Sequence, residues 1–531
     1  MRKTNVAAAL GIVAVAVCLA LPLAACGGGG SSQGSSSTGG SDTFTFGVNY
    51  FSEDIDPSNN VNSAWQCQRL GVGETLFQFD SDGAVQYCLC DDATTEDYIT
   101  WELHIREGVT FSNGNALTAS AVCESWDLVY DAEADGSTSV PSQYLAQPEY
   151  TADDETNTIT VVCQDVTANL DGILAYPYFV VIDMSVYEAD VITSIVGTGP
   201  YVLTEYVEAT SKTFEANENY WGGEVPYAGF TAVYMDDSST KAMAIQSGDV
   251  DVVENITTTS DLETLEADDS YTIASTASAR VANTYLNFDG VLADDALRQA
   301  IQYALDDETM CSVTVGGIYT SGYAVVPSSV DYGYDQLTDP YAYDADKAVE
   351  VLDDAGIVDT DGDGIRELDG ENIELTYLAY ESRSLELFAE AVATTLQAIG
   401  IGVDYQVLDY DTILGLQASG DFDMVTANTV ALPTGEPTGW LGNWYSGNSQ
   451  DYGNYSNAEY DALYEQLLTC TDDAETLELV VQMQQILLDD AATIVHGYYN
   501  STITYNNSVI SGVEMYPLDY IWVTSDWAPV G

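Results

Sequence analysis

Basic side chains are scarce in this chain. Its 531 residues include 11 lysines and arginines against 85 aspartates and glutamates, which gives a formal net charge of −74 at pH 7. Binding of DNA or RNA depends on a basic surface that neutralises phosphates, so this composition excludes a nucleic-acid-binding protein. The acidity fits either adaptation to high salt or a bias of the whole lineage, and both explanations stay open. A hydrophobic fraction of 46% excludes a disordered chain and predicts a packed core.

Histidine is nearly absent, with His104 and His496 as the two examples. There is consequently no H-E-x-x-H metalloprotease motif, and beyond residue 42 the chain also lacks the G-x-S-x-G motif of serine hydrolases. A bare transition-metal ion would usually call for imidazole ligands, so the sequence disfavours a bare-metal site. The carboxylates are too numerous to single out a catalytic pair. We therefore predict that the protein is not an enzyme, with a secreted hydrolase as the competing hypothesis.

Cysteine is present but forms no recognisable metal motif. The C-x-C pair at Cys88 and Cys90 is too tightly spaced for a zinc knuckle, and no second pair follows. Outside the cytosol an odd number of cysteines leaves at least one free, so we expect structural thiols or disulfides of undefined pairing. Apart from Cys18 and Cys26 near the N-terminus, the cysteines are Cys67, Cys88, Cys90, Cys123, Cys163, Cys311 and Cys470.

The N-terminus has the features of an exported and anchored protein. A basic start and an apolar run up to Leu21 are typical of a secretory signal peptide, which we predict to span residues 1–26. Residues 23–26, LAAC, resemble a bacterial lipobox, and this resemblance implies cleavage before Cys26 and lipidation of that residue. The alternative is an ordinary signal peptide with a chance cysteine. Residues 27–42 are rich in Gly and Ser and would form a flexible tether. We expect the mature protein to lie on the outer face of the cytoplasmic membrane, held there by lipid.

Strand and helix patterns alternate along the chain, which predicts an α/β fold. Near the midpoint, Arg280–Asp289 has the β-branched and aromatic residues of a strand. A chain of this length usually forms more than one core, so we predict that this strand crosses between two lobes and forms the floor of a cleft. Ile373–Tyr380, an apolar stripe over Leu385–Ile399, and Ile401–Val407 form a β-α-β unit, which predicts a parallel strand pair.

Capping residues predict where several helices begin. Thr118 would cap a helix over Ala119–Tyr130, and a second helix would begin at Asp294 and Asp295. Asp344 would cap a third helix that stops at Gly356. A helix over Thr476–Leu488 and a strand over Ile494–Tyr505 complete the pattern.

A series of motifs resembles the extracellular solute-binding proteins of ABC importers, in the peptide/nickel branch called family 5. The run W-x-L-x-I-R-x-G-V-x-F-S-N-G-x-x-L-T-A-x-x-V covers Trp101–Val122. Further matching segments follow in the order that the family shows, so the resemblance spans essentially the whole chain after the signal peptide. They are Gly197–Tyr201, Asn217–Gly222, Ala244–Asp251, Tyr285–Asn287, Leu297–Ile301, Asp359–Arg366 and Gly453–Asp461.

The resemblance implies a two-lobed periplasmic-binding-protein-like fold of type II, in the large peptide-binder class, with a hinge between the lobes. Lobe I would comprise residues 43–281, with an inserted subdomain over roughly 100–195. Lobe II would comprise residues 282–499, and residues 500–531 would return to lobe I. Ile494–Tyr505 would then be the second hinge crossing.

The implied function is capture of a solute, foremost an oligopeptide, for delivery to the permease and ATPase of an ABC importer. Dipeptide binders of the family place an aspartate a few residues before a G-D-P motif, whereas Gly435-Glu436-Pro437 has no acid in residues 431–434. This departure favours a longer peptide, a capped ligand or a chelated metal such as nickel. A sensor that does not transport its solute is a further alternative. We expect the protein to act as a monomer.

Scarcity makes the arginines candidates for ligand anchors. Arg69, Arg280 and Arg383 could each clamp a ligand carboxylate through two hydrogen bonds, the alternative being a structural ion pair. The other candidates lie in loops where the family lines its cleft, and core packing is the alternative for each aromatic residue among them. They are Tyr50, Phe51 and Trp65 in the first lobe, and Glu436, Trp440, Trp444 and Tyr445 in the second.

One acidic loop copies the first half of an EF-hand. Asp359, Asp361 and Asp363 occupy its first three ligand positions, and Glu367 occupies the ninth. The twelfth position is Gly370, which cannot supply the usual bidentate carboxylate. We expect no cofactor other than a weakly bound structural calcium, with a carboxylate-capped turn as the alternative.

Overall fold

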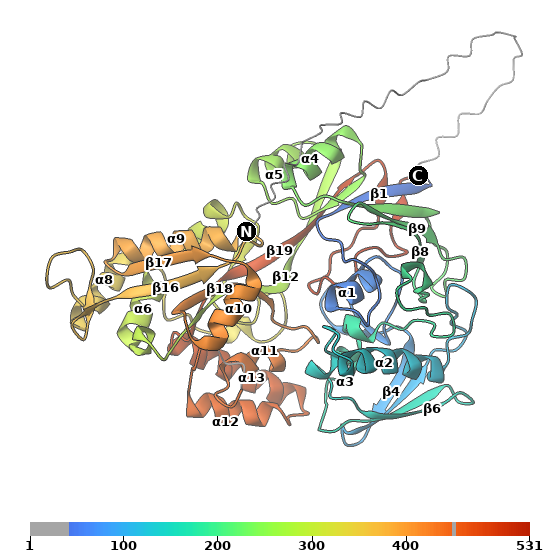
Figure 1. The fold of residues 1–531 in the computed structure, drawn as a ribbon, viewed down its shortest axis with the longest axis horizontal. Coiled ribbons are helices and arrows are strands. Elements are labelled where there is room, and N and C mark those ends of the chain that lie inside the picture. The colour runs from blue at the N-terminus through green and yellow to red at the C-terminus, as the bar shows by residue number, and fades with distance from the viewer. Residues whose placement is uncertain (1–41, 449–452) are drawn as a thin grey trace, which may run out of the picture. The chain divides into compact units, whose positions relative to one another are not determined.

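An 11-stranded mixed sheet runs through the part of the chain that the computed structural model describes, residues 42–448 and 453–531 (Figure 1). The predicted signal peptide, the lipidation site Cys26 and the tether up to residue 41 lie outside the described residues. The strand order is β17-β16-β18-β12-β19-β11-β1-β10-β9-β8, and β13 pairs with β19 beside this path. The strands are β1 (Thr43–Val48), β8 (Tyr201–Val207), β9 (Ser211–Ala216), β10 (Gly229–Tyr234), β11 (Val252–Glu254), β12 (Tyr271–Leu286), β13 (Tyr319–Ser321), β16 (Glu374–Ala379), β17 (Gly402–Val407), β18 (Met424–Val430) and β19 (Thr493–Asn506).

Smaller sheets and helices surround this central sheet. A four-stranded sheet in the order β4-β5-β7-β6 lies with α2 within residues 90–162; it overlaps the predicted inserted subdomain of roughly 100–195, but its first strand begins before that range, at Cys90. Its strands are β4 (Cys90–Thr95), β5 (Thr100–Ile105), β6 (Glu149–Asp153) and β7 (Thr158–Val162). Three two-stranded sheets pair β2 (Phe77–Phe79) with β3 (Val85–Tyr87), β14 (Glu367–Leu368) with β15 (Glu371–Asn372), and β20 (Ile510–Ser511) with β21 (Ala528–Pro529).

The helices follow the capping signals in the sequence. Thr118, Asp294 and Asp344 each accept a hydrogen bond from a backbone N–H in the first turn of α2, α6 and α8. The helices are α1 (Val61–Arg69), α2 (Ala119–Ala134), α3 (Leu170–Leu174), α4 (Ser238–Ser247), α5 (Thr259–Glu266), α6 (Asp295–Ala304), α7 (Asp307–Thr309), α8 (Ala345–Asp354), α9 (Leu385–Ala398), α10 (Tyr410–Ser419), α11 (Thr438–Leu441), α12 (Ala458–Leu467) and α13 (Asp473–Asp489). None of the described helices is long and apolar enough to span a bilayer.

The predicted β-α-β unit is confirmed. Strands β16 and β17 pair in parallel from Glu374 opposite Gly402 to Ala379 opposite Val407, and α9 connects them. The buried face of α9, including Phe388, Val392 and Leu396, packs into the same core as Leu375 of β16. Burial of this apolar stripe fixes the helix on the sheet.

The midpoint strand is longer than predicted. We expected Arg280–Asp289, but β12 begins at Tyr271 and ends at Leu286. Its first half is rich in Ala, Ser and Thr, which gives a weak strand signal, yet it pairs with β19 from Tyr271 opposite Asn506 onward. At the other end the ladder stops because Asn287 turns its side chain to the carbonyl of Phe422, at 2.8 Å.

Strands β12 and β19 join the two halves of the sheet. They lie side by side in its middle, with β11 and β1 beyond one edge and β18 and β16 beyond the other (Figure 1). Their pairing shifts register between Ala277 and Val281 and again between Ala282 and Asn283. The hydroxyl of Ser278 donates to the carbonyl of Tyr499 at 2.8 Å inside this irregular stretch. Strands β12 and β19 are therefore continuous but do not pair with each other beside Arg280, which pairs with Val430 of β18.

All seven cysteines of the described residues are free thiols. Six of them are buried and Cys470 is partly exposed. The disulfide alternative is therefore not found in this structure, and the thiols contribute as small apolar side chains of the core.

Candidate ligand-binding site

Two of the candidate arginines meet on one carboxylate. Arg69, at the end of α1, places Nη2 3.0 Å from Oδ2 of Asp519, and its Nε donates to the Asp519 carbonyl at 2.8 Å. Arg280, in β12, lies 3.7 Å from the same Oδ2. Burial alone would raise the pKa of Asp519, but Arg69, Arg280 and Arg383 together hold this pKa below its ordinary value.

Aromatic rings surround this ion pair. The guanidinium carbons of Arg69 and Arg280 lie 5.6 and 5.4 Å from the ring centroid of Trp65. Arg69 also lies 4.2 Å from the ring of Trp522, and Trp65 packs against Tyr520 at 5.8 Å. These cation–π contacts fix the two cations in a partly desolvated site.

Arg383 differs from the other two arginines. It is exposed, its guanidinium carbon lies 5.5 Å from the ring of Tyr499, and among the described residues it forms no ion pair. Its backbone φ is 48° and that of Ser384 is 59°, a left-handed conformation that costs free energy for residues other than glycine. The strained turn between β16 and α9 therefore presents an arginine without a carboxylate partner.

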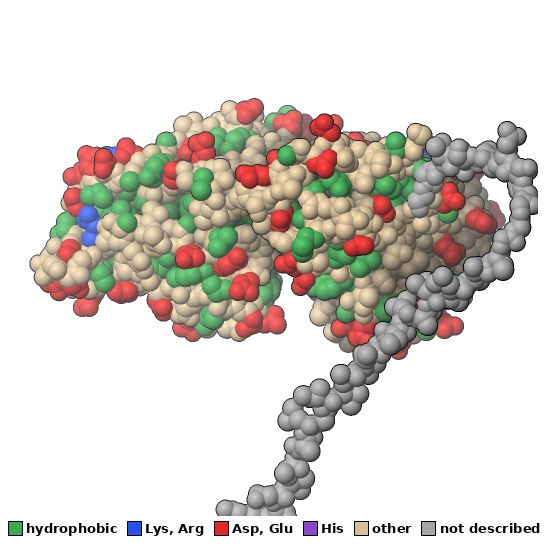
Figure 2. Space-filling view, turned by 90° about the horizontal axis from the view of Figure 1, so that it is seen from above, with side chains coloured by type: hydrophobic (Ala, Val, Ile, Leu, Met, Phe, Trp, Pro, Cys, Tyr) green, Lys and Arg blue, Asp and Glu red, His purple; other side chains and the backbone are tan. Residues whose placement is uncertain are grey.

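The charges around Asp519 do not cancel. Three arginines lower the pKa of this carboxylate. The buried Glu254 lies close to Arg69 and accepts a hydrogen bond from the backbone N–H of Asn49. Burial raises the pKa of Glu254 to about 7, although Arg69 and Lys241 oppose that rise. The cluster therefore carries excess positive charge near neutral pH, within a strongly acidic chain. Figure 2 shows the acidity of the drawn surface, over which carboxylates are spread while basic side chains are few.

The first-lobe candidates gather near this cluster. Trp65 lies inside it, as described above. Tyr50 is 47% exposed, and the carbonyl of Tyr50 accepts a hydrogen bond from Nε2 of Gln66 at 2.8 Å. Phe51 is half-buried against Tyr234, with ring centroids 6.0 Å apart. The ring of Tyr50 is thus open to solvent although its hydroxyl interacts with Asn62, and Phe51 is used partly for packing.

Glu436 lies where the two halves of the protein meet. Its carboxylate accepts hydrogen bonds from Nδ2 of Asn169 at 3.1 Å and from the backbone N–H of Thr438 at 2.8 Å. Burial raises the pKa of Glu436, and these hydrogen bonds lower it in part. Beside it is a cavity of about 540 Å³ whose charged lining is acidic, with Asp171 and Asp473. Glu436 therefore lines an interlobe cavity.

The second-lobe aromatic candidates are mostly core residues. Trp440 and Trp444 are each 3% exposed and cross edge to face, with centroids 5.1 Å apart. Nε1 of Trp440 donates to the carbonyl of Val325 at 2.8 Å. Tyr445 packs on Tyr464 at 4.8 Å. Burial of Trp440 corresponds to the core-packing alternative. Trp444 is equally buried but lines a cavity of about 130 Å³ together with Tyr285 and Tyr455.

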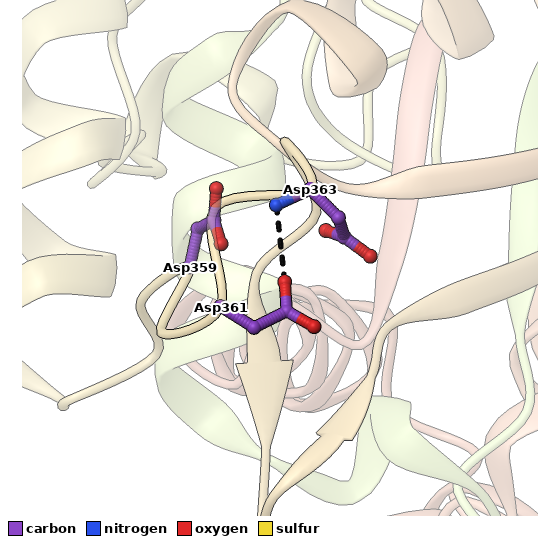
Figure 3. A group of neighbouring side chains, drawn as sticks. All are labelled: Asp359, Asp361 and Asp363. Carbon is purple, nitrogen blue, oxygen red and sulfur yellow. Dashed lines mark hydrogen bonds between the residues drawn. The ribbon is translucent and has the colours of Figure 1, made fainter.

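The acidic loop forms a set of capped turns (Figure 3). Ligand oxygens of Asp359, Asp361 and Asp363 lie within 4.8 Å of one another, and all three residues are exposed. Oδ1 of Asp361 accepts from the backbone N–H of Asp363 at 3.0 Å. Glu367 instead accepts from the backbone N–H and the hydroxyl of Thr360, at 2.8 and 2.9 Å. The aspartates are suitably grouped for a cation, but Glu367 points its carboxylate at Thr360.

Calcium binding at this loop is expected to be weak. With Glu367 engaged and Gly370 at the twelfth position, we expect a Kd no tighter than about 10⁻⁴ M, the range of extracellular modules. Isothermal titration of the wild type against Asp361→Asn measures it. Micromolar binding that the substitution abolishes would contradict this expectation.

Sequence reasoning missed several residues of the cluster. Asp519 was one carboxylate among 85, and Trp522 and Tyr499 carried no motif. One signal pointed toward Asp519: the expected return of residues 500–531 to the first lobe places this residue near the first-lobe candidates. His496 proved to be buried, with Nε2 2.9 Å from Oγ1 of Thr284 and Nδ1 2.9 Å from Oδ1 of Asp307.

Two halves joined by two strands, with a charged cluster beside the crossing, define a two-lobed solute-binding receptor. Comparison with known proteins agrees. The model of bacterial extracellular solute-binding proteins, family 5 Middle, matches residues 84–452, so the chain belongs to this family. Proteins of this family are extracytoplasmic receptors of ABC importers without catalytic activity, which confirms the predicted class and excludes an enzyme.

Curated relatives include binders of different solutes. The nickel-binding periplasmic protein of Escherichia coli is 25% identical over 372 residues, which cover 68% of this chain and 70% of the relative. The probable D,D-dipeptide-binding periplasmic protein DdpA of the same organism is 22% identical over 478 residues, covering 86% and 88%.

Solved structures share the fold. NikA from Brucella suis, in complex with Fe(III)-EDTA, superposes with a TM-score of 0.83 at 22% identity, covering 92% of this chain and all of that one. The oligopeptide-binding protein AppA from Bacillus subtilis, in complex with a nonapeptide, gives 0.73 at 20% identity, covering 93% and 100%. The predicted two-lobed α/β fold is therefore confirmed.

Proposed function

We propose that this protein captures a small solute with a free carboxylate, foremost an oligopeptide, and delivers it to an ABC importer. The observation that carries the proposal is Arg383, an exposed arginine without an acidic partner among the described residues, next to a cluster of excess positive charge. A guanidinium binds a carboxylate through two parallel hydrogen bonds, so the C-terminus of a peptide is a fitting partner. In this proposal Cys26 carries the lipid that holds the receptor at the membrane.

The acidic interlobe cavity favours a peptide over a purely anionic solute. Asp171, Glu436 and Asp473 line it, and no lysine or arginine does. Its volume of about 540 Å³ lies within the usual range for ligand pockets. A peptide has a negative C-terminus for the arginines and a positive N-terminus for such a cavity. Recognition of its backbone would tolerate varied side chains.

A chelated metal is the second candidate. The relatives include proteins named as nickel-binding, dipeptide-binding and heme-binding. A chelator such as the EDTA of the Brucella suis complex carries carboxylates that the same arginines could hold. Within the described residues, the metal-ligating group of three or more side chains is the exposed loop of Asp359, Asp361 and Asp363. A metal bound near Arg383 would therefore need to bring its own organic ligand.

Thermal shift measurements separate the two candidates. We expect peptides with a free C-terminus to raise Tm, and the same peptides with an amidated C-terminus to bind about tenfold or more weakly, because amidation removes the charge that Arg383 would pair with. Nickel with histidine serves as the chelate probe. A shift with the nickel–histidine chelate but none with a saturating peptide mixture would contradict the peptide assignment. Native mass spectrometry of the protein from its host would identify a co-purifying solute.

A further inference from the structure

Two of the few lysines are placed where lysines are seldom found. Within the described residues the lysines are Lys212, Lys241 and Lys347. Lys212 is 0% exposed and Lys241 is 1% exposed, whereas Lys347 lies on the surface beside Glu350. Complete burial of a lysine is costly unless its amine is hydrogen-bonded, so each buried lysine calls for a structural reason.

The amine of Lys212 is directed at one loop of the first lobe. From β9, Nζ donates to the carbonyls of Ser52 at 3.1 Å and Asp54 at 3.5 Å, and to Oε1 of Gln66. It also lies 4.9 Å from the ring centroid of Phe51. Across residues 42–448 and 453–531, no carboxylate lies within ion-pair distance of this amine. Backbone carbonyls of the loop thus take the place of a counter-ion.

Gln66 extends this connection to the next residue of the loop. Its Oε1 receives the lysine hydrogen bond, and its Nε2 donates to the carbonyl of Tyr50 at 2.8 Å. Residues 50–54 have no helix or strand structure, so no regular ladder holds them. Lys212 is therefore linked, directly or through Gln66, to three alternate carbonyls of this segment, those of Tyr50, Ser52 and Asp54, and the hydroxyl of Ser52 also donates to the last of them.

We propose that Lys212 is a positioning residue for solute capture: its buried amine fixes segment 50–54 and thereby sets the position of Tyr50 and Phe51 at the binding site. The inference rests on the proposed function to the extent that these two aromatic residues contact the solute. It assigns a role in binding to a residue that a ligand does not touch.

The protonation of Lys212 gives this role a pH dependence. Burial lowers the pKa of Lys212 to about 7, and Asp54 and Cys67 oppose that shift only in part. Release of the segment would expose the amine to water and restore a higher pKa, so protonation favours release. The state in which segment 50–54 is held against Lys212 is therefore favoured as pH rises from 6 to 9. The neutral amine can still hold the segment, because it donates two hydrogen bonds. The groups that face the amine or its neighbours are Glu53, Asp54, Asp56, Cys67 and Tyr206.

The experiment compares Lys212→Met with Lys241→Met in the full chain. Lys241 is an equally buried control whose amine donates to the carbonyls of Glu254 and Asn255, at 2.8 and 2.7 Å, and to none in residues 50–54. We expect chymotrypsin to cleave after Tyr50 or Phe51 about tenfold faster in Lys212→Met, because loss of the tethering hydrogen bonds releases the segment. The Lys241→Met control is expected to cleave at the wild-type rate, with fragment masses identifying the site.

Solute affinity supplies the second measurement. The ratio of wild-type to Lys212→Met affinity for a free-carboxylate peptide is expected to rise between pH 6 and 9. Wild-type cleavage rates in Lys212→Met would overturn the inference, as would faster cleavage with an affinity ratio of one at every pH. Gln66→Leu, which keeps the lysine but removes the link to Tyr50, replaces Lys212→Met if that variant fails to fold. If the wild type binds neither peptide nor chelate, the proposed function has failed, and the cleavage rates still decide whether Lys212 holds the segment.

Discussion

Replacement of Arg383 with glutamine is expected to weaken binding of a free-carboxylate peptide by about 100-fold, because two charge-assisted hydrogen bonds are lost. Arg383 has no ion-pair partner among the described residues and is exposed, so the substitution leaves no buried carboxylate unpaired and stability is expected to stay unchanged. Isothermal titration of the purified receptor measures the effect.

The matched control for this loss is Lys347→Gln. It removes one positive charge from the surface of α8, where Lys347 pairs with Glu350 at 3.0 Å. An exposed pair of this kind contributes little, so we expect wild-type affinity. The Arg383→Gln variant is also expected to lose the preference for a free over an amidated C-terminus. Retention of that preference in Arg383→Gln would show that another residue binds the carboxylate.

Replacement of Trp440 with alanine is expected to lower the free energy of unfolding by about 3–5 kcal/mol, since it removes a buried indole from the core. The hydrogen bond from Nε1 to the Val325 carbonyl is lost as well. Chemical denaturation measures the change, and the folded fraction is expected to bind peptide with wild-type affinity. Tyr343→Ala is the control, because Tyr343 is 55% exposed and surface substitutions usually change stability by within about 0.5 kcal/mol. A stable Trp440→Ala protein with reduced affinity would instead establish Trp440 as a ligand contact.

Much of the fold could be predicted because its signals are local. Thr118, Asp294 and Asp344 are short polar side chains at helix starts, and each cap requires only neighbouring residues. The parallel pairing of β16 with β17 follows from the length of the connection between them. Strand β12 was underestimated because its first half is stabilised by β19, more than two hundred residues away in sequence.

Part of the binding cluster could be predicted from composition, without a local structural signal. Arg69, Arg280 and Arg383 stood out because arginine is scarce. In the structure Arg69 and Arg280 pair with Asp519, whereas Arg383 lowers the pKa of Asp519 without forming an ion pair. Trp440 and Trp444 stood out as aromatic residues, but aromaticity serves a core as well as a ligand. Which role applies depends on burial, and burial is a property of the packed tertiary structure.

The irregular pairing of β12 with β19 has a consequence for how the receptor would respond to its solute. Strands β12 and β19 exchange no ladder pairs between Ala277 and Val281, so they can bend against each other there at a lower cost in paired hydrogen bonds, while β12 stays paired with β18 from Arg280 opposite Val430. Arg280 is within this stretch, and Asp519 and Arg69 are tied to Arg280. A solute held by these residues would lie beside the two strands that join the lobes, where its contacts could act directly on the angle between the lobes. Binding of the solute would therefore act directly on the rotation of one lobe against the other, without intervening residues that connect the site to the hinge.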